Sequence, residues 1–198
     1  MQASEKLLEK TNYTTEEYLE LEVASDERHH YIDGQIILML GGTPNHNKIT
    51  GNLYAELHSA LKRKPYEVFV TDLRVWIPEK RIYTYPDVMV VSEEVKLAEG
   101  RKDTITNPML VAEVLSKSTR SFDKDEKFKA YRTIPTFKEY LLIEQSTMLV
   151  EQYYQTNDNE WIFKEYKNEN DILILHTVDF QISLTDLYSR VSLKSSDD

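Results

Sequence analysis

The chain has 198 residues, and its hydrophobic content of 40% supports one sizeable core, so we expect a single domain over residues 1–198. The formal net charge of −10 argues against a protein that coats nucleic acid non-specifically, because such binding depends on lysine and arginine. The lack of cysteine excludes disulfides, thiolate zinc sites and cysteine nucleophiles, so a metal site must use oxygen and imidazole ligands. With no export signal and no membrane-spanning apolar run, we expect a cytoplasmic protein without a membrane partner.

The first third of the sequence predicts two helices and a hairpin. Thr14 precedes first-turn acids and a short apolar stripe, which favours a helix over about 14–23. Asp33-Gly34 between two apolar runs is a strong hairpin signal. A second helix, capped by Asn45, is indicated by apolar residues at helical spacing and should end before Pro65.

The middle of the chain is expected to alternate between strands and loops. Side chains over 66–77 alternate as in a strand, and a turn at 78–81 leads to a second strand over 82–91, so the two should form a hairpin. A charged connecting loop over 92–107 then leads to an apolar strand over 108–115.

The last part of the chain begins with a helix over 122–134, which Pro135 should end. Short strands separated by polar turns follow, and they predict a β meander. These strands are 138–144, 148–155, 160–166 and 171–177. We expect disorder only at the end of the chain, over 195–198.

Two acidic side chains lie in apolar strands. Asp87 heads the run 88–91, and Glu113 lies between Val111 and Leu115 on one strand face. Burying a carboxylate is costly unless it is paired, hydrogen-bonded or bound to a cation. If the two strands are neighbours, both carboxylates can meet one hard cation, which suits Mg²⁺ or Mn²⁺. Each acid also has a simpler explanation, since Asp87 can cap a turn after its proline and Glu113 can pair with a base.

A lysine on the following helix adds to this pattern. Lys127, Tyr131 and Ile134 share one helix face, which carries an aromatic and an aliphatic side chain and should pack inward. An ammonium there could orient an attacking water or stabilise charge that develops on a phosphate. Alternatively, the long stem of Lys127 reaches solvent, and Lys124 lies on nearly the same face.

Together these segments resemble the Uma2 family, the DUF820 group of endonucleases, which is placed in the PD-(D/E)XK restriction-endonuclease-like superfamily. The similarity covers about residues 14–185, and it rests on Ile32-Asp33-Gly34, Thr43 to Asn47, Tyr85 to Val88, Glu113 to Ser116, and Lys127 with Tyr131. The resemblance implies an α/β fold, an α+β mixed sheet flanked by helices. Its restriction-endonuclease-like core would carry the N-terminal helix and hairpin and the C-terminal β meander.

The resemblance also implies a function and a site. It implies a metal-dependent endonuclease that hydrolyses phosphodiester bonds, with DNA as the expected substrate. Asp87 and Glu113 would hold Mg²⁺ or Mn²⁺, and Lys127 would be the catalytic lysine. His30, His46 and Tyr131 are further candidates for auxiliary roles at the site. The superfamily usually has a lysine two places after the acid, where this chain has Leu115, so the resemblance implies that the lysine has moved to the helix. A homodimer is compatible with the resemblance, because restriction-type nucleases often cut two strands with two sites.

The chain departs from the family pattern near its first hairpin. The family usually has glutamate at the positions of His30 and Gln35. His30 could act as a nitrogen ligand, could mark a weakened site, or could simply pack, as a lone histidine such as His46 often does. Two other functions therefore stay open: a nuclease-fold module that binds nucleic acid or protein without catalysis, and a small assembly domain that uses its C-terminal strands.

Overall fold

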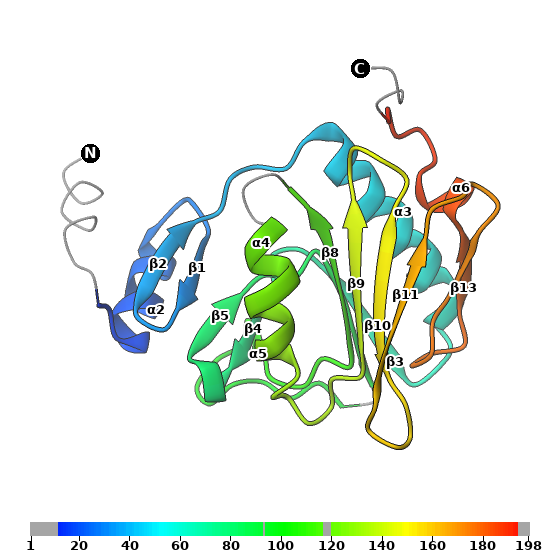
Figure 1. Cartoon of the computed structure of the whole chain (residues 1–198). Coiled ribbons are helices and arrows are strands. Elements are labelled where there is room, and N and C mark those ends of the chain that lie inside the picture. Colours follow the sequence, from blue (N-terminus) through cyan, green and yellow to red (C-terminus); the bar gives the residue numbers. More distant parts are fainter. Residues whose placement is uncertain (1–11, 93, 117–119, 194–198) are drawn as a thin grey trace.

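The computed structural model describes residues 12–92, 94–116 and 120–193, and Figure 1 shows a large central sheet with helices on both faces. The helical elements are α2 (Thr15–Ala24), α3 (Pro44–Leu61), the 3-10 turn η1 (Pro78–Lys80), α4 (Arg120–Phe122), the π-helical turn η2 (Asp123–Lys127), α5 (Phe128–Tyr131) and α6 (Leu184–Leu187). The strands are β1 (His29–Ile32), β2 (Gln35–Leu38), β3 (Tyr66–Val70), β4 (Arg74–Ile77), β5 (Ile82–Thr84), β6 (Val88–Ser92), β7 (Thr104–Ile105), β8 (Leu110–Leu115), β9 (Glu139–Glu144), β10 (Val150–Gln155), β11 (Trp161–Tyr166), β12 (Ile172–Ile174) and β13 (Gln181–Ser183).

Three sheets organise these strands. The largest has six strands in the order β11-β10-β9-β8-β6-β3, in which β8 and β9 are parallel and the other neighbours antiparallel. A five-stranded sheet has the order β2-β1-β5-β4-β7, and β12 pairs with β13 in a small third sheet. Mixed sheets flanked by helices confirm the predicted fold class.

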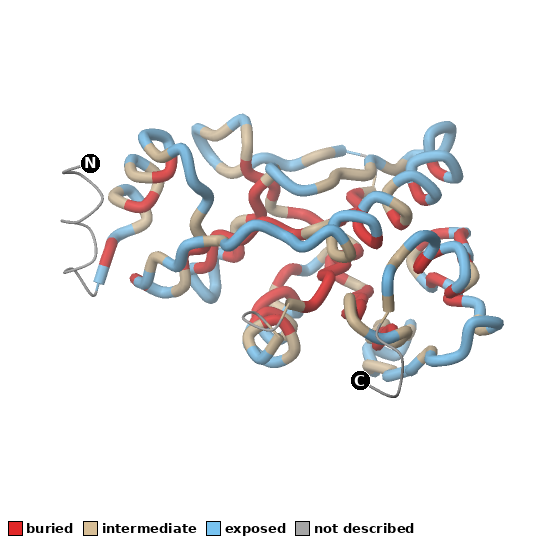
Figure 2. Tube along the Cα trace, turned by 90° about the horizontal axis from the view of Figure 1, so that it is seen from above, coloured by how far each residue is buried: buried red, intermediate tan, exposed pale blue. Residues whose placement is uncertain are grey.

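The central strands are buried on both faces, which explains their nearly continuous apolar sequences. Val90 and Ala112 pack in one core cluster with Leu53 of α3, whereas Met89 and Val111 pack in another with residues of α5. Figure 2 shows the buried segments running through the middle of the molecule. A polar side chain on either face of β6 or β8 therefore lies beneath a helix.

Several N-terminal predictions are confirmed. Thr14 caps α2 in a capping box with Glu17, and the Asp33-Gly34 turn joins β1 to β2. The second helix is also present, but its N-cap is Thr43 and not Asn45. Pro44 explains the difference, because proline is preferred at the first helical position and the cap is then the residue before it.

Two predicted strands are each divided between sheets. The strand expected over 66–77 breaks at Thr71 and Asp72, which have φ values of 47° and 27°, so that β3 and β4 lie in different sheets. The strand expected over 82–91 breaks in the same way between β5 and β6, and Pro86 within the break cannot donate a ladder hydrogen bond. Both halves of the predicted hairpin pair antiparallel as expected, β4 with β5 and β3 with β6, but in different sheets. Asp87 lies where the chain crosses between these sheets.

Later elements follow the predictions more closely. β9, β10 and β11 form three strands of the expected meander, but β12, in the segment expected to be its fourth strand, pairs with β13 in a separate sheet. The helical segment that follows β8 includes a π-helical turn. The loop expected over 92–107 contains β7, which pairs with β4, and neither β13 nor α6 was anticipated. The predicted disorder at 195–198 lies outside the described residues. Among the helices that are described, none combines the length and the apolar character needed to cross a bilayer.

Candidate active site

Asp87 lies at the junction of the two large sheets. Val88 pairs with Ala112, so Asp87 comes level with Glu113 on the neighbouring strand. The backbone N–H of Val114 donates to Asp87 Oδ2 at 2.7 Å, and His46 Nε2 lies 3.2 Å from the same oxygen. The carboxylate is therefore fixed beside Glu113 while its side chain keeps 16% of its surface exposed.

Glu113 is buried in the middle of the six-stranded sheet. Its Oε1 accepts from Lys127 Nζ at 3.0 Å and from the Tyr131 hydroxyl at 3.2 Å. Burial, together with the charges of Asp123 and Asp87, raises the pKa of Glu113 to about 8 despite the opposing effect of the Lys127 ammonium. Negative charge at this carboxylate is thus unfavourable unless a cation offsets it.

Lys127 projects from η2 toward Glu113 and is almost fully buried. Its Nζ also lies 2.8 Å from Asp123 Oδ1, an ion pair by distance. The angle of this contact is poor for a hydrogen bond, so Asp123 Oδ1 has no hydrogen-bond donor among the described residues. Burial lowers the pKa of Lys127, but Glu113 and Asp123 outweigh it and raise the pKa above its ordinary value, so the ammonium stays charged.

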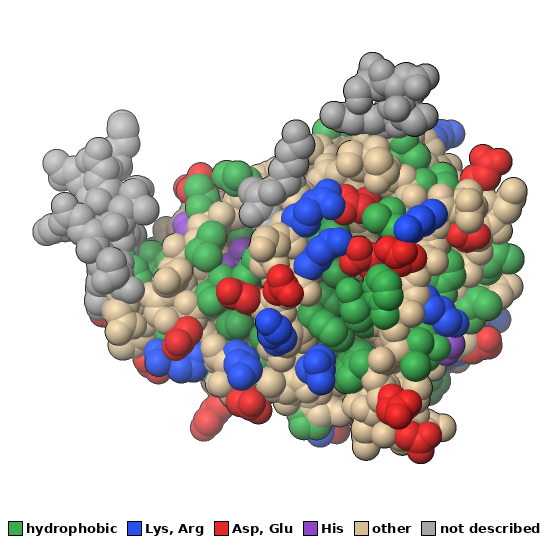
Figure 3. All heavy atoms as spheres, in the orientation of Figure 1, with side chains coloured by type: hydrophobic (Ala, Val, Ile, Leu, Met, Phe, Trp, Pro, Cys, Tyr) green, Lys and Arg blue, Asp and Glu red, His purple; other side chains and the backbone are tan. Residues whose placement is uncertain are grey.

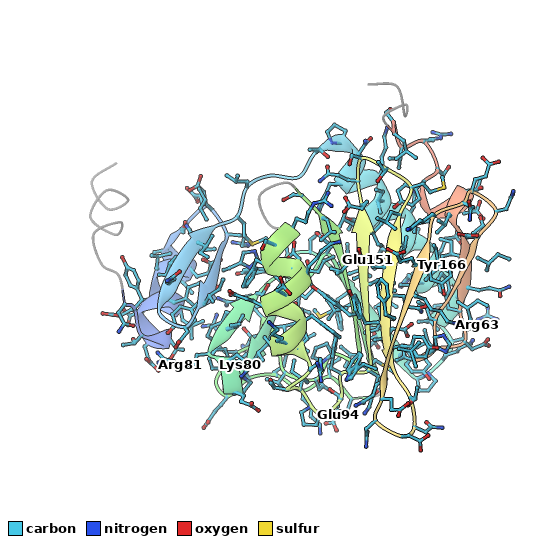
Figure 4. The ribbon with its side chains drawn as sticks, in the orientation of Figure 1. Arg63, Lys80, Arg81, Glu94, Glu151 and Tyr166 are labelled. Atoms are coloured by element: carbon cyan, nitrogen blue, oxygen red, sulfur yellow. The ribbon has the colours of Figure 1, made fainter. Side chains whose placement is uncertain are left out.

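Lys124, the other candidate lysine, lies elsewhere. Its Nζ contacts Glu151 on β10 at 2.6 Å, and 31% of its side chain is exposed. Arg120 pairs with Glu144 nearby. Figure 4 labels Glu151 on the sheet, and Figure 3 shows cationic and anionic side chains interspersed on this face. The bases around the helical segment are therefore largely offset by acids, and Lys127 is the lysine that reaches Glu113.

His46 reaches the site from the first turn of α3. His46, expected to be a packing residue or an auxiliary residue of the site, lies with its Nε2 3.2 Å from Asp87 Oδ2. Burial alone would lower the pKa of His46. The hydrogen bond to Asp87 and the negative charges of Asp87 and Asp123 outweigh this effect, so the pKa lies above its ordinary value. The start of α3 is held in place by Asn45, which donates to the carbonyl of Gln145 at 3.1 Å, while Gln145 donates to the carbonyl of Leu115 at 2.7 Å.

His30 lies on β1 and is also buried. Its Nδ1 is 3.1 Å from Thr84 Oγ1, and its ring centroid is 6.5 Å from that of Phe122. Burial, with the nearby charges of Lys127 and His29, lowers the pKa of His30 to about 3, so the imidazole is neutral. His30 is therefore a buried, neutral side chain near Lys127.

The donor set fits a hard divalent cation held by few protein ligands. No group of three or more histidine or acidic side chains in the described ranges is arranged to hold a metal. Mg²⁺, however, often binds through one or two carboxylates and keeps several waters. Asp87, just before β6, and Glu113 on β8 offer such a pair, and burial, the main cause of the raised pKa of Glu113, disfavours its charged form unless a cation lies close.

One residue of the cluster, Asp123, was not a candidate in the sequence analysis. It is buried and contacts Lys127. The signal was present, because an acid four residues before a lysine on a helix places the two side chains on the same face. That spacing is common on exposed helices and does not by itself reveal burial.

Comparison with known proteins places the chain in a family. The model of the Uma2 family, described as "Putative restriction endonuclease", matches residues 15–185. Two proteins of Synechocystis sp. are similar in sequence. "Uncharacterized protein sll1609" is 45% identical over a match that covers 79% of this chain and 89% of that protein. "Uncharacterized protein slr1290" is 34% identical over a match that covers 87% of this chain and 90% of that protein. The fold also matches the crystal structure of a "putative nuclease belonging to DUF820" from Anabaena variabilis, with a TM-score of 0.74 and 18% identity over 89% of this chain and 98% of that one. The extent of the family match and the close relatives show that this chain belongs to the Uma2 family.

Proposed function

We propose that this protein is a nuclease of the PD-(D/E)XK type that uses Mg²⁺ or Mn²⁺ to hydrolyse phosphodiester bonds within DNA. The observation that carries the proposal is that Asp87, just before β6, lies level with Glu113 on β8, with the Lys127 ammonium buried against Glu113. The family description and the fold shared with a DUF820 protein support the same class of activity.

Asp87 and Glu113 would hold the cation. When bound, such a cation lowers the pKa of a coordinated water and offsets charge on the phosphate. The amide of Val114 fixes the orientation of Asp87, and Tyr131 does the same for Glu113. Burial, together with Glu113 and Asp123, keeps the pKa of Tyr131 well above its ordinary value, so its hydroxyl remains a donor.

Lys127 would stabilise the negative charge that develops on the phosphate during hydrolysis. Its ammonium stays charged, is held at a fixed position and is shielded from water, and these are the conditions under which one positive charge has its largest effect on a transition state. His46 would support the site by contacting the side of Asp87 that faces α3.

A plasmid-nicking assay tests this proposal. We expect the wild-type protein to convert supercoiled plasmid to nicked or linear forms with Mg²⁺ or Mn²⁺, and to be inactive in EDTA. Asp87→Asn, Glu113→Gln and Lys127→Met should each abolish cleavage while circular dichroism shows a retained fold. Lys124→Met is the matched control, since Lys124 pairs with Glu151 away from the site. Absence of wild-type cleavage of duplex DNA, single-stranded DNA and RNA with every cation would contradict the proposal.

A binding module without catalysis is the second candidate. It is favoured by the contacts of Glu113, whose Oε1 is already occupied by Lys127 and Tyr131, and by His30 at a position where the resemblance implies glutamate. Such a module would bind nucleic acid or protein without cation affinity that depends on Asp87 and Glu113.

Light scattering would separately test the homodimer that the resemblance allows.

A further inference from the structure

The ammonium of Lys127 is shared by two buried carboxylates. Its Nζ lies 3.0 Å from Glu113 Oε1 and 2.8 Å from Asp123 Oδ1, and side-chain exposure is 5% for Glu113 and 3% for both other residues. Of these two carboxylates, only Glu113 would hold the divalent cation in the proposed function. Asp123 thus belongs to the charge cluster without a role in the proposed reaction.

The sharing matters because an ammonium and a divalent cation compete for the same carboxylate. If Glu113 were the sole counter-ion of Lys127, cation binding would leave a buried ammonium without a partner, which is strongly unfavourable. We propose that Asp123 is a positioning residue that keeps the Lys127 ammonium in the site when Glu113 takes a divalent cation. This inference rests on the proposed function.

The local backbone supports this role. Asp123 and Lys127 are the first and last residues of η2, and π-helical turns often occur at functional sites. The Tyr140 hydroxyl donates to the Asp123 carbonyl at 3.1 Å, which fixes the start of the turn on β9. Asp123 Oδ1 has no hydrogen-bond donor among the described residues, and the cation that pairs with it is Lys127, with Nζ at 2.8 Å.

A double-mutant cycle on Mn²⁺ binding, measured by isothermal titration calorimetry, tests the inference. We expect Asp123→Asn to weaken Mn²⁺ binding about tenfold, because Lys127 is then held by Glu113 alone. In the Lys127→Met background the same substitution should change affinity by less than about threefold, because the competing ammonium is gone. Asp125→Asn, an exposed acid in the same turn, is the matched control and should change affinity by less than about twofold.

The outcomes separate the inference from the proposed function. An equal loss for Asp123→Asn in both backgrounds would mean that Asp123 acts as a general negative charge, and it would overturn the inference alone. No wild-type Mn²⁺ binding that depends on Asp87 and Glu113 would overturn both.

If Lys127→Met does not fold, ¹⁵N NMR of the lysine ammonium groups replaces it. We expect the protected Lys127 signal to persist through a Mg²⁺ titration of the wild type and to be lost in Asp123→Asn. Persistence in both proteins would refute the role of Asp123.

Discussion

Replacement of Lys127 by methionine should destabilise the protein strongly. Methionine keeps the length and apolar stem of lysine but removes the ammonium, so Glu113 and Asp123 lose the cation that lies 3.0 and 2.8 Å away. Both carboxylates are almost completely buried, and solvent cannot replace the lost partner. Breaking a buried ion pair by removing one member typically costs about 3–5 kcal/mol, and we expect a loss in the free energy of unfolding of that size.

Urea denaturation followed by circular dichroism measures this loss. Lys124→Met is the control, because Lys124 makes an ion pair from the same helical segment but is 31% exposed, so its removal should cost about 1 kcal/mol or less. Added Mn²⁺ should restore part of the stability of Lys127→Met, since a divalent cation can replace the ammonium beside Glu113. Equal losses for the two variants, both near 1 kcal/mol, would refute the reasoning that Lys127 is the essential counter-charge.

Two further predictions concern His30 and the first helix. Burial, with the charge of Lys127, lowers the pKa of His30 from its ordinary 6.5 to about 3, so only the unfolded chain takes up this proton below pH 6.5. Wild-type stability should therefore fall by about 2 kcal/mol more than that of His30→Gln between about pH 7 and pH 5 in urea denaturation, and parallel curves would contradict this. Thr14→Ala removes the N-cap of α2 and should lower the free energy of unfolding by about 1 kcal/mol. The neighbouring Thr15→Ala should be nearly neutral in the same assay, and an equal loss for both would argue against the capping box.

The strands that carry the two acids were predictable because burial on both faces leaves a clear sequence signal. The runs after Asp87 and around Glu113 are apolar and rich in β-branched residues, and both became central strands. The sequence does not show that these two strands are neighbours, because strand order is set by tertiary packing. The change of sheet at Pro86 was missed, because alternation of side chains continues through a short break and does not reveal where a strand passes from one sheet to another.

The remaining members of the cluster were harder to predict for a related reason. His46 meets Asp87 across 41 positions of sequence, through the packing of α3 against the sheet, and spacing carries no information about such a contact. Asp123 was missed because four-residue spacing to a lysine indicates a shared face but not burial. The inward direction of Lys127 was better determined, since Tyr131 and Ile134 marked its helix face as apolar.

The location of a bound cation tests the central claim most directly. Crystals of the wild-type protein soaked in Mn²⁺, with anomalous diffraction recorded near the manganese edge, would show where the ion lies. The proposed function predicts an anomalous peak coordinated by carboxylate oxygens of Asp87 and Glu113, with Lys127 Nζ still beside Asp123. An ion bound elsewhere, or no peak between the two carboxylates when Mn²⁺ supports cleavage in solution, would contradict it.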